Sequence, residues 1–222
     1  MIDNQHIKLW QLINPTLPIG SFAYSQGQEY AVEAGWIKDE AAATEWILSL
    51  LENFLAVTEI PIILRCYQAT VENDWKTFVY WNRTLLAMRE SAELYQEDIQ
   101  LGSAMIKIMP SLNLNWPERF KDMNTSYSAA YGFACAMQGV DRQQAAEGLM
   151  WAWCEKQVAA AIKLVPLGQT AGQRILTAAI DKIPEAANRG LQCSDEDIGM
   201  LAPGFAMASA LHEVQYSRLF RS

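Results

Sequence analysis

The chain is rich in alanine and leucine and poor in β-branched valine. Its 222 residues include 30 Ala and 22 Leu but only 8 Val. Alanine and leucine are the strongest helix formers, whereas valine favours strands. No segment shows an apolar–polar alternation that rises above this helical background. The sequence therefore predicts an all-α protein.

Apolar spacing places the individual helices. Between residues 39 and 58, apolar side chains recur at steps of three and four, with Asp39 in position to cap the helix. Similar patterns predict helices at Ser21–Glu33, Ile60–Glu72, Trp75–Arg89, Ala92–Met109, Tyr127–Gln138, Gln143–Leu164, Ala171–Lys182 and Pro203–Tyr216. Breaks are expected at proline- and glycine-containing turns, Pro184 among them. The fold expected for residues 1–222 is a single-domain bundle of about ten helices with short loops.

Charge and cysteine usage limit the partners and the compartment. Lys and Arg number 17 against 25 Asp and Glu, a formal net charge of −8. Such an acidic chain without a basic run is a poor ligand for nucleic acid or anionic lipid, so neither is expected as a partner. The four cysteines are widely spaced, which argues against a disulfide framework and fits a reducing cytosol.

No segment of the sequence is expected to enter a membrane. The first ten residues lack the apolar core of a signal peptide. The most apolar stretch, Trp46–Leu64, is interrupted by Glu52, Glu59 and Pro61. Carboxylates are costly inside a bilayer, so a cytoplasmic location is expected.

Several kinds of chemistry have no sequence support. Neither a P-loop nor a G-x-G-x-x-G motif occurs, so no nucleotide cofactor is expected. The two histidines, His6 and His212, lie at opposite ends and cannot form a metal-binding pair on one helix, although a mixed His/Cys/carboxylate site stays open. We therefore expect no catalytic, cofactor or metal residues in this chain.

One enzymatic alternative remains. Ser25 lies in Ala23–Gly27, which is similar to a nucleophile elbow without its first glycine, and His212 could act as its base. Glu29 and Glu33, four residues apart, could form an acid/base pair, although such pairs are more often a solvated helix face. A helical hydrolase or lyase using Ser25 or Glu29/Glu33 is the alternative hypothesis.

Three segments are unusual for a plain helical bundle. Asn14–Gly27 combines two prolines with Gly20 and Gly27, and reads either as a turn packed on the core or as a contact surface. In Lys163–Gln173, the lysine either balances a helix dipole or meets a partner's carboxylate. His212–Ser222 ends in arginines and aromatics, the residue types enriched in interface hot spots, or else docks on its own core.

Together these segments resemble the UreF family of urease accessory proteins. The first carries Pro-x-x-Pro-x-Gly-x-Phe-x-Tyr-Ser-x-Gly at Pro15–Gly27, and Glu33-Ala34-Gly35 follows it. The second carries Pro-Leu-Gly-Gln-x-x-Gly-Gln at Pro166–Gln173, and the third carries His-Glu-x-Gln-Tyr-Ser-Arg-Leu-Phe-Arg-Ser at His212–Ser222. The resemblance extends over the whole chain.

This resemblance implies an all-α, cytosolic and non-catalytic protein that takes part in nickel insertion into urease. It further implies a homodimer bound to UreD (also called UreH), which recruits the GTPase UreG and delivers nickel to apo-urease. The chain would bridge UreD and UreG and regulate GTP hydrolysis. A related possibility is that Lys163, Arg218 or Arg221 enters the nucleotide site of the GTPase directly.

The resemblance also suggests which residues meet partners. We expect the tail, defined here as residues 216–222, to become ordered when UreD binds, while Glu29, Glu33 and Lys163 face the GTPase. The predicted partner-interface residues are Tyr24, Glu29, Glu33, Lys163, Gln169, His212, Tyr216, Arg218, Phe220 and Arg221.

The chain departs from the family pattern at two places. Gln28 stands where the family usually has leucine. In the segment 126–132, serines occupy positions where the family often carries His and Pro. The missing histidine favours a scaffold over a nickel store.

Overall fold

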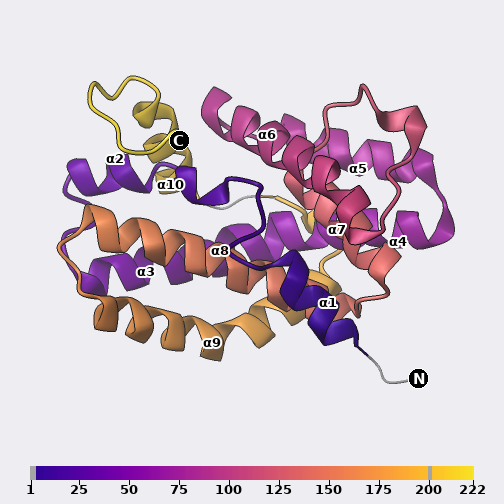
Figure 1. Cartoon of the computed structure of the whole chain (residues 1–222). Coiled ribbons are helices and arrows are strands. Elements are labelled where there is room, and N and C mark those ends of the chain that lie inside the picture. The colour runs from indigo at the N-terminus through magenta and orange to yellow at the C-terminus, as the bar shows by residue number, and fades with distance from the viewer. Residues whose placement is uncertain (1–3, 200–201) are drawn as a thin grey trace.

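The computed structural model describes residues 4–199 and 202–222, and within these ranges the protein contains no β-strand (Figure 1). The described helices are α1 (Gln5–Leu12), α2 (Gln28–Glu33), α3 (Glu40–Leu50), α4 (Ile60–Glu72), α5 (Trp75–Ala87), α6 (Ala92–Ile108), α7 (Tyr127–Gln138), α8 (Arg142–Leu164), α9 (Gln169–Gln192) and α10 (Pro203–His212). A π-helical stretch, Leu51–Glu59, joins α3 to α4, and four 3-10 turns complete the list. The predicted all-α class is confirmed.

Side-chain caps explain where several helices begin. Asp39 accepts a hydrogen bond from the Ala42 amide at 2.9 Å, as predicted. Asp74, Ser91, Ser126 and Asp141 cap α5, α6, α7 and α8 in the same way. Such a cap satisfies an amide that has no partner inside the helix. The predicted bounds of α4 and α7 are those of the structure.

Residues Glu40 to Glu72 form one continuous helical segment, whereas the sequence pattern placed a boundary just before Pro61. Proline has no amide hydrogen to bond the carbonyl four residues earlier, that of Val57. Here the Gly199 amide donates to the Val57 carbonyl at 3.1 Å instead. Arg189 likewise donates to the Glu52 carbonyl. Contacts from distant segments therefore satisfy the carbonyls that the π-helical geometry and the proline leave open.

This 33-residue segment is also long and apolar enough to cross a membrane by composition alone. However, 72% of its most apolar window is buried inside the protein. The segment is therefore a core helix of the fold, because its apolar side chains already contact other helices.

Three other elements differ from the sequence expectation. Ser21–Glu33 is not one helix, because Gln26 (φ 57°) and Gly27 (φ 76°) adopt left-handed conformations that end the turn at Ser21–Ala23. Helix α10 ends at His212, before Tyr216. Helix α1 lies in a segment for which no helix was predicted.

The break expected at Pro184 is wrong, because α9 continues through it to Gln192. Proline inside a helix frees the carbonyl four residues earlier, here that of Ile180. Pro184 is exposed and Ile180 is 52% exposed, so this part of the helix faces water. Water can then satisfy the freed carbonyl, which lowers the cost of the proline.

The helices share a single apolar core. Helix α8 packs along α9, and α4 packs against α5 and α7 (Figure 1). Helix α10 packs against α2 and α6, so the C-terminal segment returns to the region just after residue 20. The four cysteines, Cys66, Cys135, Cys154 and Cys193, are all free, as the sequence predicted.

Gln28, the departure from the family pattern, has an unusual environment. Its side chain is fully buried in α2, and neither amide atom has a hydrogen-bond partner among the described residues. An unsatisfied buried polar group costs about 1–3 kcal/mol. We expect Gln28→Leu to raise the free energy of unfolding by about 1–3 kcal/mol in urea titrations. The control, Gln144→Leu on the exposed face of α8, should change it by less than about 0.5 kcal/mol. A destabilised Gln28→Leu protein would contradict this prediction.

Candidate functional site

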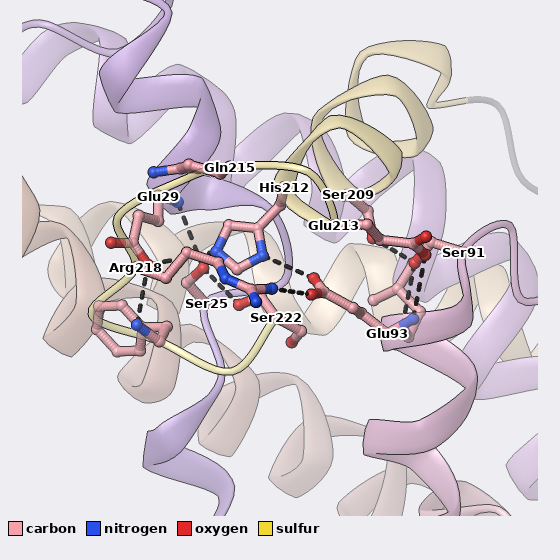
Figure 2. Close-up of polar contacts among 12 residues, drawn as sticks. Ser25, Glu29, Ser91, Glu93, Ser209, His212, Glu213, Gln215, Arg218 and Ser222 are labelled. Atoms are coloured by element: carbon pink, nitrogen blue, oxygen red, sulfur yellow. Dashed lines mark hydrogen bonds and ion pairs between the residues drawn. The ribbon is translucent and has the colours of Figure 1, made fainter.

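The tail lies against the turn that precedes α2, and its backbone is held by one buried carboxylate. The amides of Leu219 and Phe220 donate to the two carboxylate oxygens of Glu29 at 2.6 and 2.9 Å. The Arg221 amide donates to the Ala23 carbonyl at 2.9 Å. Figure 2 shows the tail as a loop that passes over Glu29. Hydrogen bonds to an ionised acceptor are stronger than neutral ones, so Glu29 is the main backbone anchor.

Ser222 is the second anchor. Its backbone oxygen accepts three hydrogen bonds, from the Ser25 amide at 2.6 Å, the Gln26 amide at 2.9 Å and the Ser25 hydroxyl at 2.6 Å. Its own hydroxyl donates to the Glu97 carboxylate at 2.7 Å. The two successive amides of Ser25 and Gln26 thus converge on one oxygen atom, as in a backbone anion-binding nest. The Pro15–Gly27 segment therefore acts as a receptor for the tail.

Side chains of the tail add two more contacts. The Arg218 guanidinium lies 2.6 Å from the Glu93 carboxylate of α6. Phe220 is buried, and the Lys163 ammonium lies 5.5 Å from the centre of its ring. A cation at this distance over an aromatic ring is attracted to its face. These contacts join the tail to both α6 and α8.

The tail is therefore docked on the body of the chain in this structure. That it becomes ordered when UreD binds stays a prediction. Glu29 was expected to face a GTPase, but its side chain is buried and its carboxylate accepts hydrogen bonds from the tail. Sequence patterns could not show this, because the donor and acceptor are 190 residues apart.

Docking leaves a set of apolar side chains in solvent. Tyr216 is fully exposed, Val214 is 80% exposed and Leu219 is 66% exposed, although the amide of Leu219 is bonded to Glu29. Met207 and Leu211, four residues apart on α10, are also exposed. We call these five residues the apolar patch. Exposed apolar groups gathered on one segment are typical of a protein-binding surface.

The remaining predicted residues are distributed differently. Tyr24 is buried, and its hydroxyl donates to Gln100 at 2.6 Å. Glu33 ends α2 and Gln169 begins α9; both are exposed and take no part in the hydrogen bonds that hold the tail. Lys163 is exposed at the end of α8. The structure thus brings Glu29, His212 and residues 218–222 together and leaves Glu33 and Gln169 outside this cluster.

Two glutamates of α6 belong to the site but were not identified from the sequence. Glu93 binds Arg218 and His212, and Glu97 binds Ser222 and, at 3.1 Å, the Lys156 ammonium. Their spacing of four residues places both on one face of α6. The sequence could have suggested that an acidic pair on some helix binds the arginines of the tail. It does not show which of the acidic helices is the partner.

The geometry does not favour a nucleophilic Ser25. The residue follows a 3-10 turn instead of a strand, and its hydroxyl donates to the Ser222 oxygen. The two ring nitrogens of His212 face Glu93 and Glu29, not Ser25. A serine nucleophile needs a base within hydrogen-bond reach of its hydroxyl. Glu29 and Glu33 do not form an acid/base pair either, because one is buried under the tail and the other is exposed.

A buried ionic network lies beneath the site. Arg89 contacts Glu59 at 2.5 Å and Asp98 at 2.7 Å, and each of the three side chains is 10% exposed or less. Burial raises the pKa of Asp98 to about 6, although Arg89 acts to lower it. A cavity of about 80 Å³ lies next to this network and the Lys156–Glu97 pair. Within residues 4–199 and 202–222, no group of three or more His, Cys, Asp or Glu side chains could hold a metal ion.

Comparison with known proteins agrees with the resemblance to UreF that the sequence motifs indicate. A family model described as UreF matches residues 37–180. A urease accessory protein UreF from Alkalilimnicola ehrlichii is 47% identical over 97% of this chain and 95% of its own length. One from Alcanivorax borkumensis is 42% identical over the full length of both chains, and UreF 2 from Brucella anthropi is 42% identical over 97% of this chain and 96% of its own. These relatives are named as accessory proteins and not as enzymes. The chain belongs to the UreF family of urease accessory proteins.

Proposed function

We propose that this chain is a cytoplasmic scaffold for urease maturation that bridges UreD (UreH) and the GTPase UreG during GTP-dependent nickel delivery to apo-urease. The names of its relatives support a role in urease maturation. The observation that carries the proposal is the docked tail, which leaves the side chains of Tyr216 and Leu219 in solvent. Such a rigid apolar display has no use in the folding of the chain itself.

The apolar patch is the proposed contact for UreD. Aromatic and aliphatic anchors at the centre of an interface carry most of its binding energy. Ordering a flexible segment on binding costs free energy, which lowers affinity. In this structure Glu29, Ser25 and Gln26 hold the tail in one conformation. Tyr216 and Leu219 can therefore contribute their burial without a large ordering cost.

A second surface is proposed for UreG. Lys163, Glu33 and Gln169 are exposed, and Lys163 and Gln169 flank the corner between α8 and α9. Lys163 offers a cation there for an acidic group of the GTPase, with regulation of GTP hydrolysis as the consequence. Direct insertion of Arg218 into a nucleotide site is less consistent with the structure, because Glu93 binds its guanidinium. Arg221 has an exposed side chain and stays a candidate.

A homodimer within the complex is also part of the proposal. Ile7 and Trp10, three residues apart on α1, are 55% and 61% exposed. Apolar side chains of this size on one helix face are suited to a self-complementary interface. Burial of Trp10 against the second copy would remove this surface from water.

The proposal is tested by removing the apolar side chains that the tail displays. We expect Tyr216→Ala combined with Leu219→Ala to weaken binding to purified UreD by about 1,000-fold, since loss of a hot-spot side chain costs about 2 kcal/mol or more and two such losses make about 4 kcal/mol. Binding would be measured by calorimetry and by co-purification. The control is Ile180→Ala, which truncates another exposed apolar residue, on α9, and should leave UreD affinity unchanged. Unchanged affinity of the double variant, with the fold intact by circular dichroism, would reject this surface.

A further inference from the structure

The loop that joins α6 to α7 passes beside α5 (Figure 1), and a groove of about 720 Å³ lies between them. Its volume is within the range that ligand sites in proteins occupy. From α5 the groove is lined by four residues that share one helix face, Val79, Arg83, Leu86 and Ala87. The loop contributes residues 119, 120 and 122–124, and α6 contributes Tyr95. The residues that hold the tail do not line this groove.

The two walls of the groove are fixed to each other by Asn82 of α5. Its side chain is fully buried; its Nδ2 donates to the Asn124 carbonyl at 2.8 Å, and its Oδ1 accepts from the Ser126 amide at 2.8 Å. Phe120 of the loop is also buried and stacks on Phe78 of α5, with 5.9 Å between the ring centres. The groove is therefore formed by the fold itself, and a bound segment would not have to order its walls.

The charge of the groove is opposite to that of the chain. Arg83 and Arg119 line it against one carboxylate, that of Asp122, which leaves the lining with a charge of +1 in a chain of net charge −8. Both arginines are exposed, and neither has an ion pair in the part of the chain that the structure describes. The Arg119 guanidinium lies 5.7 Å from the centre of the Trp75 ring, a contact that positions the cation without neutralising it.

The rest of the lining is mainly apolar or aromatic, and this narrows the kind of ligand. Leu86 and Phe120 are buried side chains of the walls, and Tyr95 and Met123 are partly exposed. Arginine, tyrosine, phenylalanine and methionine are the residue types enriched in protein interfaces. The apolar lining favours apolar groups, and the two cations favour carboxylates. Nucleic acid and inorganic anions lack the apolar groups, and a polyanion would also be repelled by the acidic chain.

We propose that this groove is a docking site for an acidic segment of a partner protein, a short stretch in which apolar side chains alternate with Asp or Glu. The apolar side chains enter between α5 and the loop, and the carboxylates pair with Arg83 and Arg119. None of the residues proposed above as contacts for UreD, UreG or the second copy lines this groove. The site therefore goes beyond the proposed function and does not depend on it.

The first experiment locates binding of a defined probe on the full-length protein. The probe is the pentapeptide Glu-Leu-Glu-Leu-Glu, and the protein carries ¹³C-methyl methionine. Met123 lines the groove, whereas Met137, 52% exposed at the end of α7, does not. We expect the NMR signal of Met123 to shift as the peptide is added and that of Met137 to stay unchanged. No shift of Met123 at about 1 mM peptide, a concentration that detects even weak complexes, would overturn the proposal.

Two matched peptides separate the charge of the segment from its apolar groups. Lys-Leu-Lys-Leu-Lys keeps the leucines and inverts the charge, and Glu-Ser-Glu-Ser-Glu keeps the charge and removes the leucines. We expect each to bind at least about tenfold more weakly than the probe, because each lacks one of the two complementary features. Equal binding of the basic peptide would reject the role of the arginines. Equal binding of the serine peptide would make the groove a site for anions in general and would also overturn the proposal.

The second experiment removes the two cations from the groove. Arg83→Ala combined with Arg119→Ala should weaken binding of the probe at least about tenfold. The matched control combines Lys107→Ala with Arg142→Ala; both residues are exposed and lie outside the groove, so net charge changes equally while the affinity stays within about twofold. Unchanged affinity of the groove variant would overturn the proposal.

A charge reversal guards against a folding defect. Arg83→Glu leaves the contact between Arg119 and Trp75 in place and puts a carboxylate on the groove wall. We expect it to bind Lys-Leu-Lys-Leu-Lys at least about fivefold more tightly than the wild-type protein does, a gain that misfolding could not produce. Absence of this gain in a folded variant would reject pairing at Arg83. Because these measurements involve neither UreD nor UreG, their failure is distinguishable from failure of the proposed function.

Discussion

Arg89→Met is expected to lower the free energy of unfolding by about 3–5 kcal/mol, because it leaves two buried carboxylates without a counter-charge. Arg89 contacts both Glu59 and Asp98, and the side chains of all three are 10% exposed or less. The carboxylates have other donors, the Ser128 hydroxyl on Glu59 and the Tyr127 amide on Asp98, but neither donor carries a positive charge. Urea titrations at pH 7 measure the loss.

The loss should shrink as the pH falls. Burial already raises the pKa of Asp98 to about 6, and removal of Arg89 takes away the cation that opposes this effect. A carboxyl group whose pKa is higher in the folded than in the unfolded protein binds more protons in the folded state. Stability then falls as the pH rises and recovers as it drops. We expect the gap between the variant and the wild-type protein to be smaller at pH 5 than at pH 7.5.

Arg174→Met is the matched control. Arg174 contacts both carboxylate oxygens of Glu40, at 2.7 and 2.6 Å, but its side chain is 60% exposed. Solvent weakens such a pair, so its loss should lower the free energy of unfolding far less than loss of Arg89 does. Equal losses in Arg89→Met and Arg174→Met would show that burial does not set the strength of the Arg89 network.

Gly102→Ala is expected to be the most damaging single-methyl substitution in α6. A Cβ atom at Gly102 would overlap the Thr125 carbonyl oxygen and would lie 2.9 Å from the Ser126 carbonyl carbon. Both neighbours are backbone atoms, so no side chain can move aside. Overpacking of this kind typically costs about 1–3 kcal/mol, and we expect a value at or above the upper end. Thermal and urea unfolding measure the loss.

Gly204→Ala separates the steric effect from the helix preference of alanine. Gly204 lies in the first turn of α10, and no heavy atom falls within 4 Å of its Cβ position. Alanine there should leave stability unchanged or raise it by up to about 1 kcal/mol. If Gly102→Ala is tolerated equally well, α6 does not pass as close to residues 125–126 as the structure shows.

Local sequence features were sufficient for the elements whose signals lie within one or two turns. The bounds of α4 and α7 and the Asp39 cap were predicted because apolar periodicity and capping residues act over three or four positions. The same reasoning failed for the segment Ser21–Glu33, where the left-handed conformation of Gln26 and Gly27 ends the turn. Sequence reasoning also failed at Pro184. The free-energy cost of a proline inside a helix depends on whether the carbonyl that it frees can reach water, which the sequence does not show.

The candidate site shows the same division. The sequence singled out Pro15–Gly27 and His212–Ser222 as unusual segments, and the structure brings both into one cluster. It did not show that one segment binds the other, nor that Glu93 and Glu97 of α6 complete the cluster. No local pattern encodes a contact between a carboxylate and amides 190 residues away.

The sequence by itself determined the all-α class, most of the helices and the family of this protein, because these depend on residue preferences and motifs that are read along the chain. Only the tertiary structure decided that the tail is docked, that Glu29 is used internally and that His212 lies between two carboxylates. Those features depend on which charged groups share a buried volume, and burial is a property of the folded chain rather than of any segment.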